Sequence, residues 1–195
     1  MYYVLRRLPL TNEKGEALIE IHNTFRLGRI RLWKNGQAIA PELRDFPQPI
    51  QIEFDAFRGY EGPPVELLDS GIPLMSKRMA DAVIEAGVDN VQFFPVALRC
   101  KQTTREYEFR AYNIVGLVAA TDLGKSEYQV HDEKPVGDVS FDTLALDEKK
   151  IRGQLLFRLA ENFNAIVVHE KVRRTLLEKG IDSIEFVSPE DWMHL

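Results

Sequence analysis

The chain has little cysteine and no long apolar run. Its 195 residues include one cysteine, Cys100, so no disulfide can form within the chain. A transmembrane helix needs roughly 18 consecutive apolar residues, and the longest apolar run, Ile114–Ala120, is much shorter. Arg6 and Arg7 follow the first apolar residues, which is the reverse of a secretory signal peptide. We therefore exclude a disulfide scaffold, expect no membrane partner and expect a reduced, cytoplasmic location.

Basic residues are also fewer than acidic residues. The sequence has 25 Lys and Arg against 30 Asp and Glu, a formal net charge of −5 at pH 7. Proteins that bind duplex DNA neutralise its phosphates with a surplus of basic residues, so duplex DNA is not an expected partner. Hydrophobic residues make up 45% of the chain and charged residues 28%, which is typical of a globular protein that buries its own core.

Hydrophobic periodicity predicts strands along most of the chain. Residues 50–57 alternate between apolar and polar, which indicates a half-buried strand. An antiparallel pair is expected at 91–98 and 107–118, across the polar turn 101–105. Further strands are expected at 2–8, 65–68, 127–131, 139–146, 155–160, 165–168 and 184–187. The predicted fold class is α+β with a mainly antiparallel sheet, in a single domain 1–195 where residues 1–70 are assigned only as an N-terminal subregion.

Two helices are expected, at 76–86 and 169–179, each followed by a glycine that can end it in the left-handed conformation. The segments that contain them match at an offset of 93 residues. Ser76–Phe93 is SKRMADAVIEAGVDNVQF, and His169–Phe186 is HEKVRRTLLEKGIDSIEF. Each segment describes a helix, a glycine, an aspartate turn and a strand. An internal repeat and chance convergence on a common local solution both explain the match.

Motifs of the common catalytic and cofactor sites are missing. G-x-S-x-G, a Walker-type glycine loop and G-x-G-x-x-G do not occur, so no cofactor is predicted. The segment 131–133, His-Asp-Glu, is more typical of a solvated acidic loop than of a metal site. Cys100 is expected to be a buried structural thiol and not a nucleophile. A hydrolase-like enzyme with a carboxylate pair such as Glu106 and Glu108 stays open as an alternative function.

A second alternative is an RNA-binding or small-ligand module. Residues 25–34 interleave aromatic and basic side chains, and the candidate ligand-binding stretch is Arg26–Lys34. Residues 1–60 carry nine Lys and Arg against seven Asp and Glu, a net charge of +2, whereas the rest of the chain carries −7. A strand with one charged face explains the same pattern without a ligand. Exposure of Trp33 would favour nucleic-acid stacking, and its burial would oppose it.

From about residue 70 onward the chain resembles a known family. The resemblance rests on the order of several motifs, none diagnostic alone: PLMSKRM at 73–79, GVDNVQFFP at 87–95, YNIVGLV at 112–118, LFRL at 156–159, IVVHEKV at 166–172, GIDSIEFV at 180–187, and Trp192. Together they are similar to immunity proteins of bacterial polymorphic toxin systems, a family first described as a domain of unknown function. The similarity covers residues 70–192, and residues 1–70 show none.

The resemblance implies a single α+β domain that binds and neutralises a cognate protein toxin without catalysis. It supplies no catalytic residues. Acidic inhibitor surfaces suit basic enzyme clefts, and residues 121–150 carry eight Asp and Glu against four Lys. Asp132, Glu133, Asp138 and Asp142 are therefore the predicted partner-binding residues. A solvated loop that only aids solubility explains the same composition, and the oligomeric state stays open.

Overall fold

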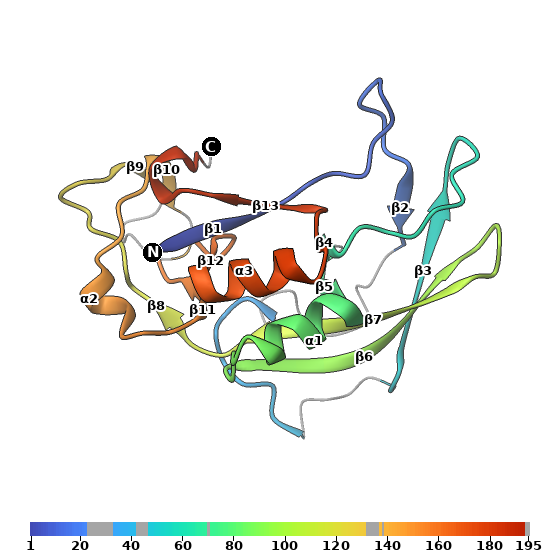
Figure 1. Ribbon diagram of the computed structural model, residues 1–195, viewed down its shortest axis with the longest axis horizontal. Helices are drawn as coiled ribbons and strands as arrows, with labels where there is room; N and C mark the ends of the chain where they lie inside the picture. Colours follow the sequence, from blue (N-terminus) through green and yellow to red (C-terminus); the bar gives the residue numbers. More distant parts are fainter. Residues whose placement is uncertain (23–32, 42–46, 70, 132–136, 138, 194–195) are drawn as a thin grey trace.

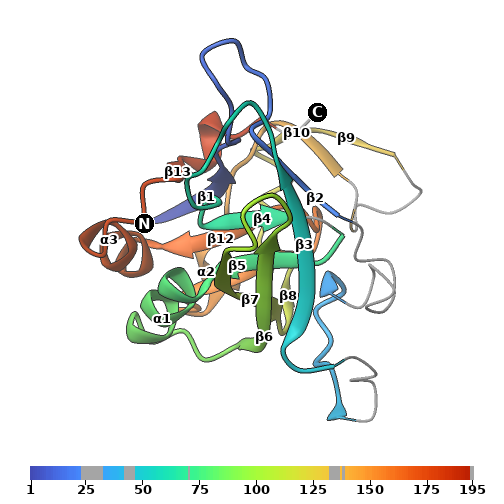
Figure 2. The ribbon, with the colours of Figure 1, turned by 90° about the vertical axis from the view of Figure 1, so that its right-hand side faces the viewer.

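The computed structural model describes residues 1–22, 33–41, 47–69, 71–131, 137 and 139–193. It has the expected α+β fold, in which most strands belong to two mainly antiparallel sheets. Helices α1 (Lys77–Glu85) and α3 (Glu170–Glu178) pack against each other. Figures 1 and 2 show that each helix lies beside a different sheet, so the pair joins the two halves of the molecule.

The larger sheet has six strands in the described part of the chain. Their order across the sheet is β2 (Ile19–Ile21), β3 (Ile50–Ala56), β6 (Val91–Cys100), β7 (Glu106–Ile114), β5 (Pro73–Ser76) and β4 (Leu67–Asp69). The hairpin of β6 and β7 is the antiparallel pair expected from the sequence. Alternate residues of β3 are buried, as its pattern predicts, and β3 runs parallel to β6.

The second sheet has five strands among the described residues. Their order is β13 (Ile184–Val187), β1 (Tyr2–Arg7), β12 (Ile166–His169), β11 (Leu156–Leu159) and β8 (Leu117–Val118). The strand at the start of the chain therefore lies between two strands from its end, and both pair with it antiparallel. A separate hairpin is formed by β9 (Glu127–Val130) and β10 (Val139–Thr143).

The two helix–glycine–strand segments have the same topology. In one, β5, α1 and β6 follow in order, and β7 lies between the two strands, antiparallel to both. In the other, β12, α3 and β13 follow in order, and β1 lies between them in the same way. Each is a split β-α-β unit. The sequence match at an offset of 93 thus has a structural counterpart.

The ends of both helices form where local signals predict them. The Ser76 hydroxyl accepts the Met79 N–H at 3.0 Å, and the His169 ring nitrogen accepts the Lys171 N–H at 3.2 Å. Both side chains are N-caps, which satisfy amides left unpaired at the first turn. Gly87 and Gly180 follow the helices with φ of 93° and 70°. A residue with a side chain is strained at such positive φ, whereas glycine is not.

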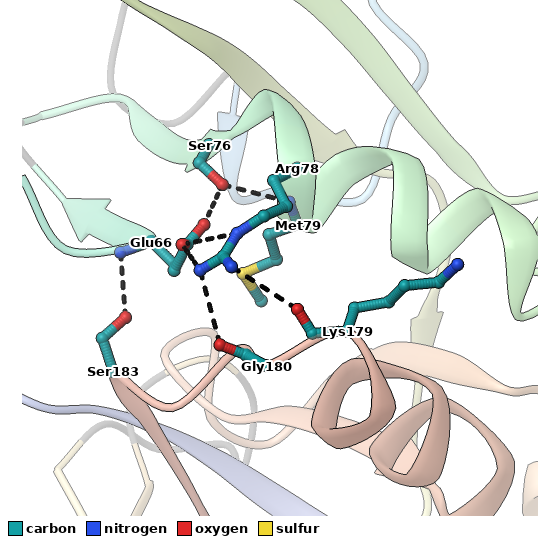
Figure 3. A network of polar contacts seen from close by, with 7 residues as sticks. All are labelled: Glu66, Ser76, Arg78, Met79, Lys179, Gly180 and Ser183. Carbon is teal, nitrogen blue, oxygen red and sulfur yellow. Dashed lines mark hydrogen bonds and ion pairs between the residues drawn. The ribbon is translucent and has the colours of Figure 1, made fainter.

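A polar network fixes the contact between the helices (Figure 3). The Glu66 carboxylate accepts hydrogen bonds from the Ser76 hydroxyl and from the Arg78 guanidinium. Arg78 also donates to the carbonyls of Lys179 and Gly180, each at 3.4 Å, at the end of α3. The Ser183 hydroxyl accepts the Glu66 N–H at 2.9 Å. The beginning of α1 is thereby tied to the loop between α3 and β13.

One core is shared by both sheets, and each sheet also has a core of its own. The shared core contains Val83 of α1 and Leu176 of α3, packed with apolar residues from β1, β7 and β12. The opposite face of the six-stranded sheet packs around Trp33, and the opposite face of the five-stranded sheet packs around Phe157 and Trp192. Apolar burial is the main stabilising term in folding, so the shared core is what couples the two sheets.

One local prediction was wrong, and one short helix was not predicted. The apolar run Ile114–Ala120 was expected to be a single buried strand continuing from 107, but β7 ends at Ile114 and β8 belongs to the other sheet. Gly116 allows the break, because its φ is 94° and its N–H donates to the Gly36 carbonyl at 2.7 Å. The acidic segment also contains an unexpected short helix, α2 (Glu148–Ile151), which begins where the Asp147 carboxylate accepts the Lys149 N–H.

Candidate functional site

The β9–β10 hairpin carries the predicted partner-binding residue that the structure describes. Asp132, Glu133 and Asp138 lie outside the described residues. Asp142 is exposed on β10, at a β-bulge between Phe141 and Thr143 where the pairing with β9 shifts. A bulge inserts one unpaired residue and redirects side chains. Asp142 is therefore held outward by regular structure and not by a loop.

Several acidic residues around this hairpin are neutralised. Lys125 pairs with Asp122 at 3.0 Å, and their hydrogen bond lowers the pKa of the Asp122 carboxyl. Lys150 pairs with Asp147 at 3.8 Å. Asp142 and the exposed Glu127 form no ion pair with the residues described. The free negative charge in this part of the surface is thus smaller than the composition of 121–150 indicates.

The same hairpin also exposes two apolar side chains. All four residues of β9 are exposed, and they include Tyr128 and Val130, which are 37% and 40% exposed. We call Glu127, Tyr128, Val130 and Asp142 the hairpin surface. Tyrosine combines a large apolar ring with a polar tip and is enriched at protein interfaces, and carboxylates at an interface steer a basic partner. The composition of the hairpin surface is suited to a basic protein partner.

Residues that could support catalysis do not form a nucleophile–base pair in the described chain. Cys100 is buried, and its thiol contacts the Gln102 side-chain oxygen at 3.5 Å. His22 hydrogen-bonds to Asp55, whose other oxygen accepts from Gln102 at 2.8 Å. Gln102 therefore lies between the thiol and the histidine–aspartate pair. Glu106 and Glu108 are exposed on β7.

The basic and aromatic segment is only partly described. Residues 26–32 lie outside the described chain. Trp33 is fully buried and packs edge-on against Phe94, with ring centroids 5.5 Å apart. Lys34 pairs with Asp69 at 2.9 Å. Because a stacking platform must be accessible, burial of Trp33 counts against the RNA-binding alternative for this residue.

The sequence did not predict a cleft at the seam between the sheets. It has a volume of about 380 Å³, and its polar lining includes Arg7 of β1, Lys34, Asp69 of β4, Arg158 of β11 and Asn164. Tyr112 of β7 also lines it, and burial raises the pKa of this phenol to about 12. Arg158 could have been noticed in the sequence, because it is a charged residue inside the otherwise apolar strand 156–159.

The described residues contain neither a metal-ligating cluster nor a membrane-spanning helix. No group of three or more His, Cys, Asp or Glu side chains in the described ranges could hold a metal ion. No helix within those ranges is long and apolar enough to cross a membrane.

Fold and surfaces together define a mixed α+β protein in which a helix pair joins two mainly antiparallel sheets. The sequence model of the immunity protein family Imm11 matches residues 12–191, and the chain belongs to this family. The match confirms the resemblance and extends it to most of residues 1–70, where the motifs gave no indication. A comparison with curated proteins found no significant match. Membership of an immunity protein family suggests toxin immunity, and a toxin partner in general, through non-enzymatic inhibition.

Proposed function

We propose that the protein neutralises a cognate bacterial toxin in the cytoplasm by binding it as a one-to-one inhibitor. The observation that carries this proposal is the family match, which covers residues 12–191. A cell that makes a toxin must suppress nearly all of it, so the complex must be tight, and known immunity pairs are among the tightest non-covalent complexes. The free, buried thiol of Cys100 suits a reducing compartment.

The hairpin surface, with Asp132, Glu133 and Asp138, is the proposed contact region. Acidic side chains there would steer a basic toxin surface into place and increase the association rate. Tyr128 and Val130 are exposed on the same hairpin and would supply apolar contact once the proteins meet. This division of roles makes kinetics the most informative measurement.

Neutralisation itself is tested by rescue. The toxin encoded beside this gene is expressed with and without the chain, and growth and complex formation are measured. Restored growth together with a co-purifying one-to-one complex is expected. If the chain does not restore growth, toxin immunity is contradicted. Rescue without a complex contradicts stoichiometric inhibition and favours the enzyme alternative.

The contact region is tested by charge reversal with the same toxin. The double variant Asp142→Lys and Glu127→Lys should associate about tenfold more slowly at low ionic strength, with a flatter dependence on salt. Its dissociation rate should change less, because charges at an interface rim act mainly on encounter. The double variant Glu106→Lys and Glu108→Lys makes the same change in charge at two exposed positions of β7, in the six-stranded sheet, and serves as the control. Equal association rates for the double variant and the wild type would eliminate the hairpin surface as the contact region.

A further inference from the structure

The cleft between the sheets contains a buried arginine that forms no ion pair with a described carboxylate, although the charge of Asp69, which is paired with Lys34, acts on it. Arg158 is 2% exposed, and its guanidinium donates to the Phe163 carbonyl through Nη1. Its Nε has no hydrogen-bond partner among the described residues, and no described carboxylate forms an ion pair with it. Arginine stays charged in proteins, and a buried charge is costly unless it is paired. The structure therefore leaves one strong donor group unsatisfied at the cleft.

The N–H groups of Arg158 that lack an acceptor determine which shape of acceptor group a ligand must have. A guanidinium is a planar fork of five N–H groups. With Nη1 engaged by Phe163, the remaining edge consists of Nε and Nη2, two parallel donors in one plane. The two oxygens of a carboxylate match such an edge and accept both bonds at once.

Further positive charge surrounds this edge. Lys34 donates to Asp69 at 2.9 Å and to Asn164 at 3.2 Å, which leaves one of its three ammonium protons free. Lys34 thereby offsets part of the negative charge of Asp69. Arg7 also lines the cleft, and its charge acts on Tyr112 at the same place. In a protein with a net charge of −5, the cleft is a local concentration of positive charge.

The rest of the lining distinguishes a carboxylate from a phosphate. Leu5, Leu67 and Ile166 give the cleft an apolar side, which suits the carbon body that carries a carboxylate. Asp69, the carboxylate among the described lining residues, would oppose the higher charge of a phosphate more strongly than that of a monoanion. Shape, charge and apolar contact thus agree on one ligand class.

We propose that this cleft is a carboxylate-binding site, in which the Nε–Nη2 edge of Arg158 receives the ligand and Lys34 and Arg7 hold it from the rim. The carboxylate could belong to a free small molecule or to an Asp or Glu side chain of a protein partner. The site differs in chemistry from the acidic hairpin surface. It stands on its own geometry and does not depend on the proposed toxin partner.

The test uses the full chain and two probes at constant ionic strength. Propionate represents a free carboxylate, and the blocked peptide acetyl-Gly-Glu-Gly-amide represents a protein side chain, so that each probe carries one negative charge. The reporter is the Nε–H resonance of Arg158, identified by its loss in Arg158→Lys. We expect a saturable shift of this resonance with at least one probe. Tighter binding of the peptide assigns the site to a protein partner, and tighter binding of propionate assigns it to a small molecule.

Variants at the rim make the test specific. Lys34→Gln and Arg7→Gln keep the buried Arg158 in place and should each weaken binding about tenfold, since each removes one charge-assisted contact. Arg99→Gln changes an exposed residue of β6 and should bind both probes as the wild type does. The proposal is overturned if neither probe produces a saturable shift, if both rim variants bind as tightly as the wild type, or if inorganic phosphate binds more tightly than both carboxylates. None of these measurements involves a toxin, so this site and toxin immunity can fail separately.

Discussion

Among single residues, Glu161 is a carboxylate placed where ionisation is unfavourable. Its side chain is 6% exposed, and burial raises its pKa above the usual 4.5, opposed in part by hydrogen bonds from the backbone. Its Oε2 has no hydrogen-bond partner among the residues described. Because the folded state holds this proton more tightly than the unfolded chain does, protonation favours folding.

The sign of the pH dependence follows. Stability from this group is present below about pH 4.5 and is lost as the pH rises through the higher pKa of the folded state. Glu161→Gln does not titrate, so its free energy of unfolding relative to the wild type should increase between about pH 4 and pH 7. Urea denaturation at several pH values measures this difference. A difference independent of pH would show that burial does not shift the pKa of Glu161.

Among the helices and strands, the first turn of α1 is held by more contacts than its N-cap alone. Ser76 both caps α1 and donates to Glu66, which is bound in turn to Arg78 and through its N–H to Ser183 (Figure 3). Ser188 caps a short 3-10 helix, Pro189–Asp191, and its hydroxyl contacts Asp191 alone among the side chains described. A serine N-cap therefore occurs both at a helix that packs in the shared core and at a short helix near the surface.

This contrast gives a matched pair of variants. Ser76→Ala should lower the free energy of unfolding by about 1–2 kcal/mol, the upper part of the range for loss of an N-cap. Ser188→Ala should cost less, because it removes contacts only within one exposed turn. Chemical denaturation of both variants at neutral pH measures the difference. Equal costs would mean that the contact with Glu66 adds nothing to the cap.

The elements set by local signals could be predicted from the sequence, and those set by distant contacts could not. Both long helices have an apolar stripe, an N-cap and a terminal glycine, all within one segment of chain. The break at Gly116 depends on hydrogen bonds to Gly36 and Asn90, which no local pattern reveals. Likewise, the charged lining of the cleft comes from strands far apart in the sequence, so its residues could be suspected singly but not brought together.

For the whole molecule, the three cores determine how it unfolds. The two outer cores each contain one of the two tryptophans, Trp33 beside the six-stranded sheet and Trp192 beside the five-stranded sheet. The shared core between them includes both long helices. If this core couples the sheets, neither can unfold while the other stays intact.

The tryptophans are natural reporters of this coupling. Fluorescence of Trp33→Phe follows the five-stranded sheet, and fluorescence of Trp192→Phe follows the six-stranded sheet. In each variant the unfolding transition followed by fluorescence should coincide with the transition followed by circular dichroism. Coincident transitions are the standard sign of a single cooperative unit. Leu176→Ala opens a cavity in the shared core. It should lower the free energy of unfolding by about 2–5 kcal/mol, whichever tryptophan reports the transition. Transitions that separate would divide the chain into two domains.

The position of β1 between β12 and β13 has a consequence for how the protein is made. The strands of the six-stranded sheet all lie between residues 19 and 114, so this sheet can assemble while the ribosome is still adding the rest of the chain. Strand β1 is synthesised before the six-stranded sheet, but both of its partners emerge only after that sheet is complete. Until then its apolar residues have no sheet to join, and the growing chain must protect this strand while the six-stranded sheet is made.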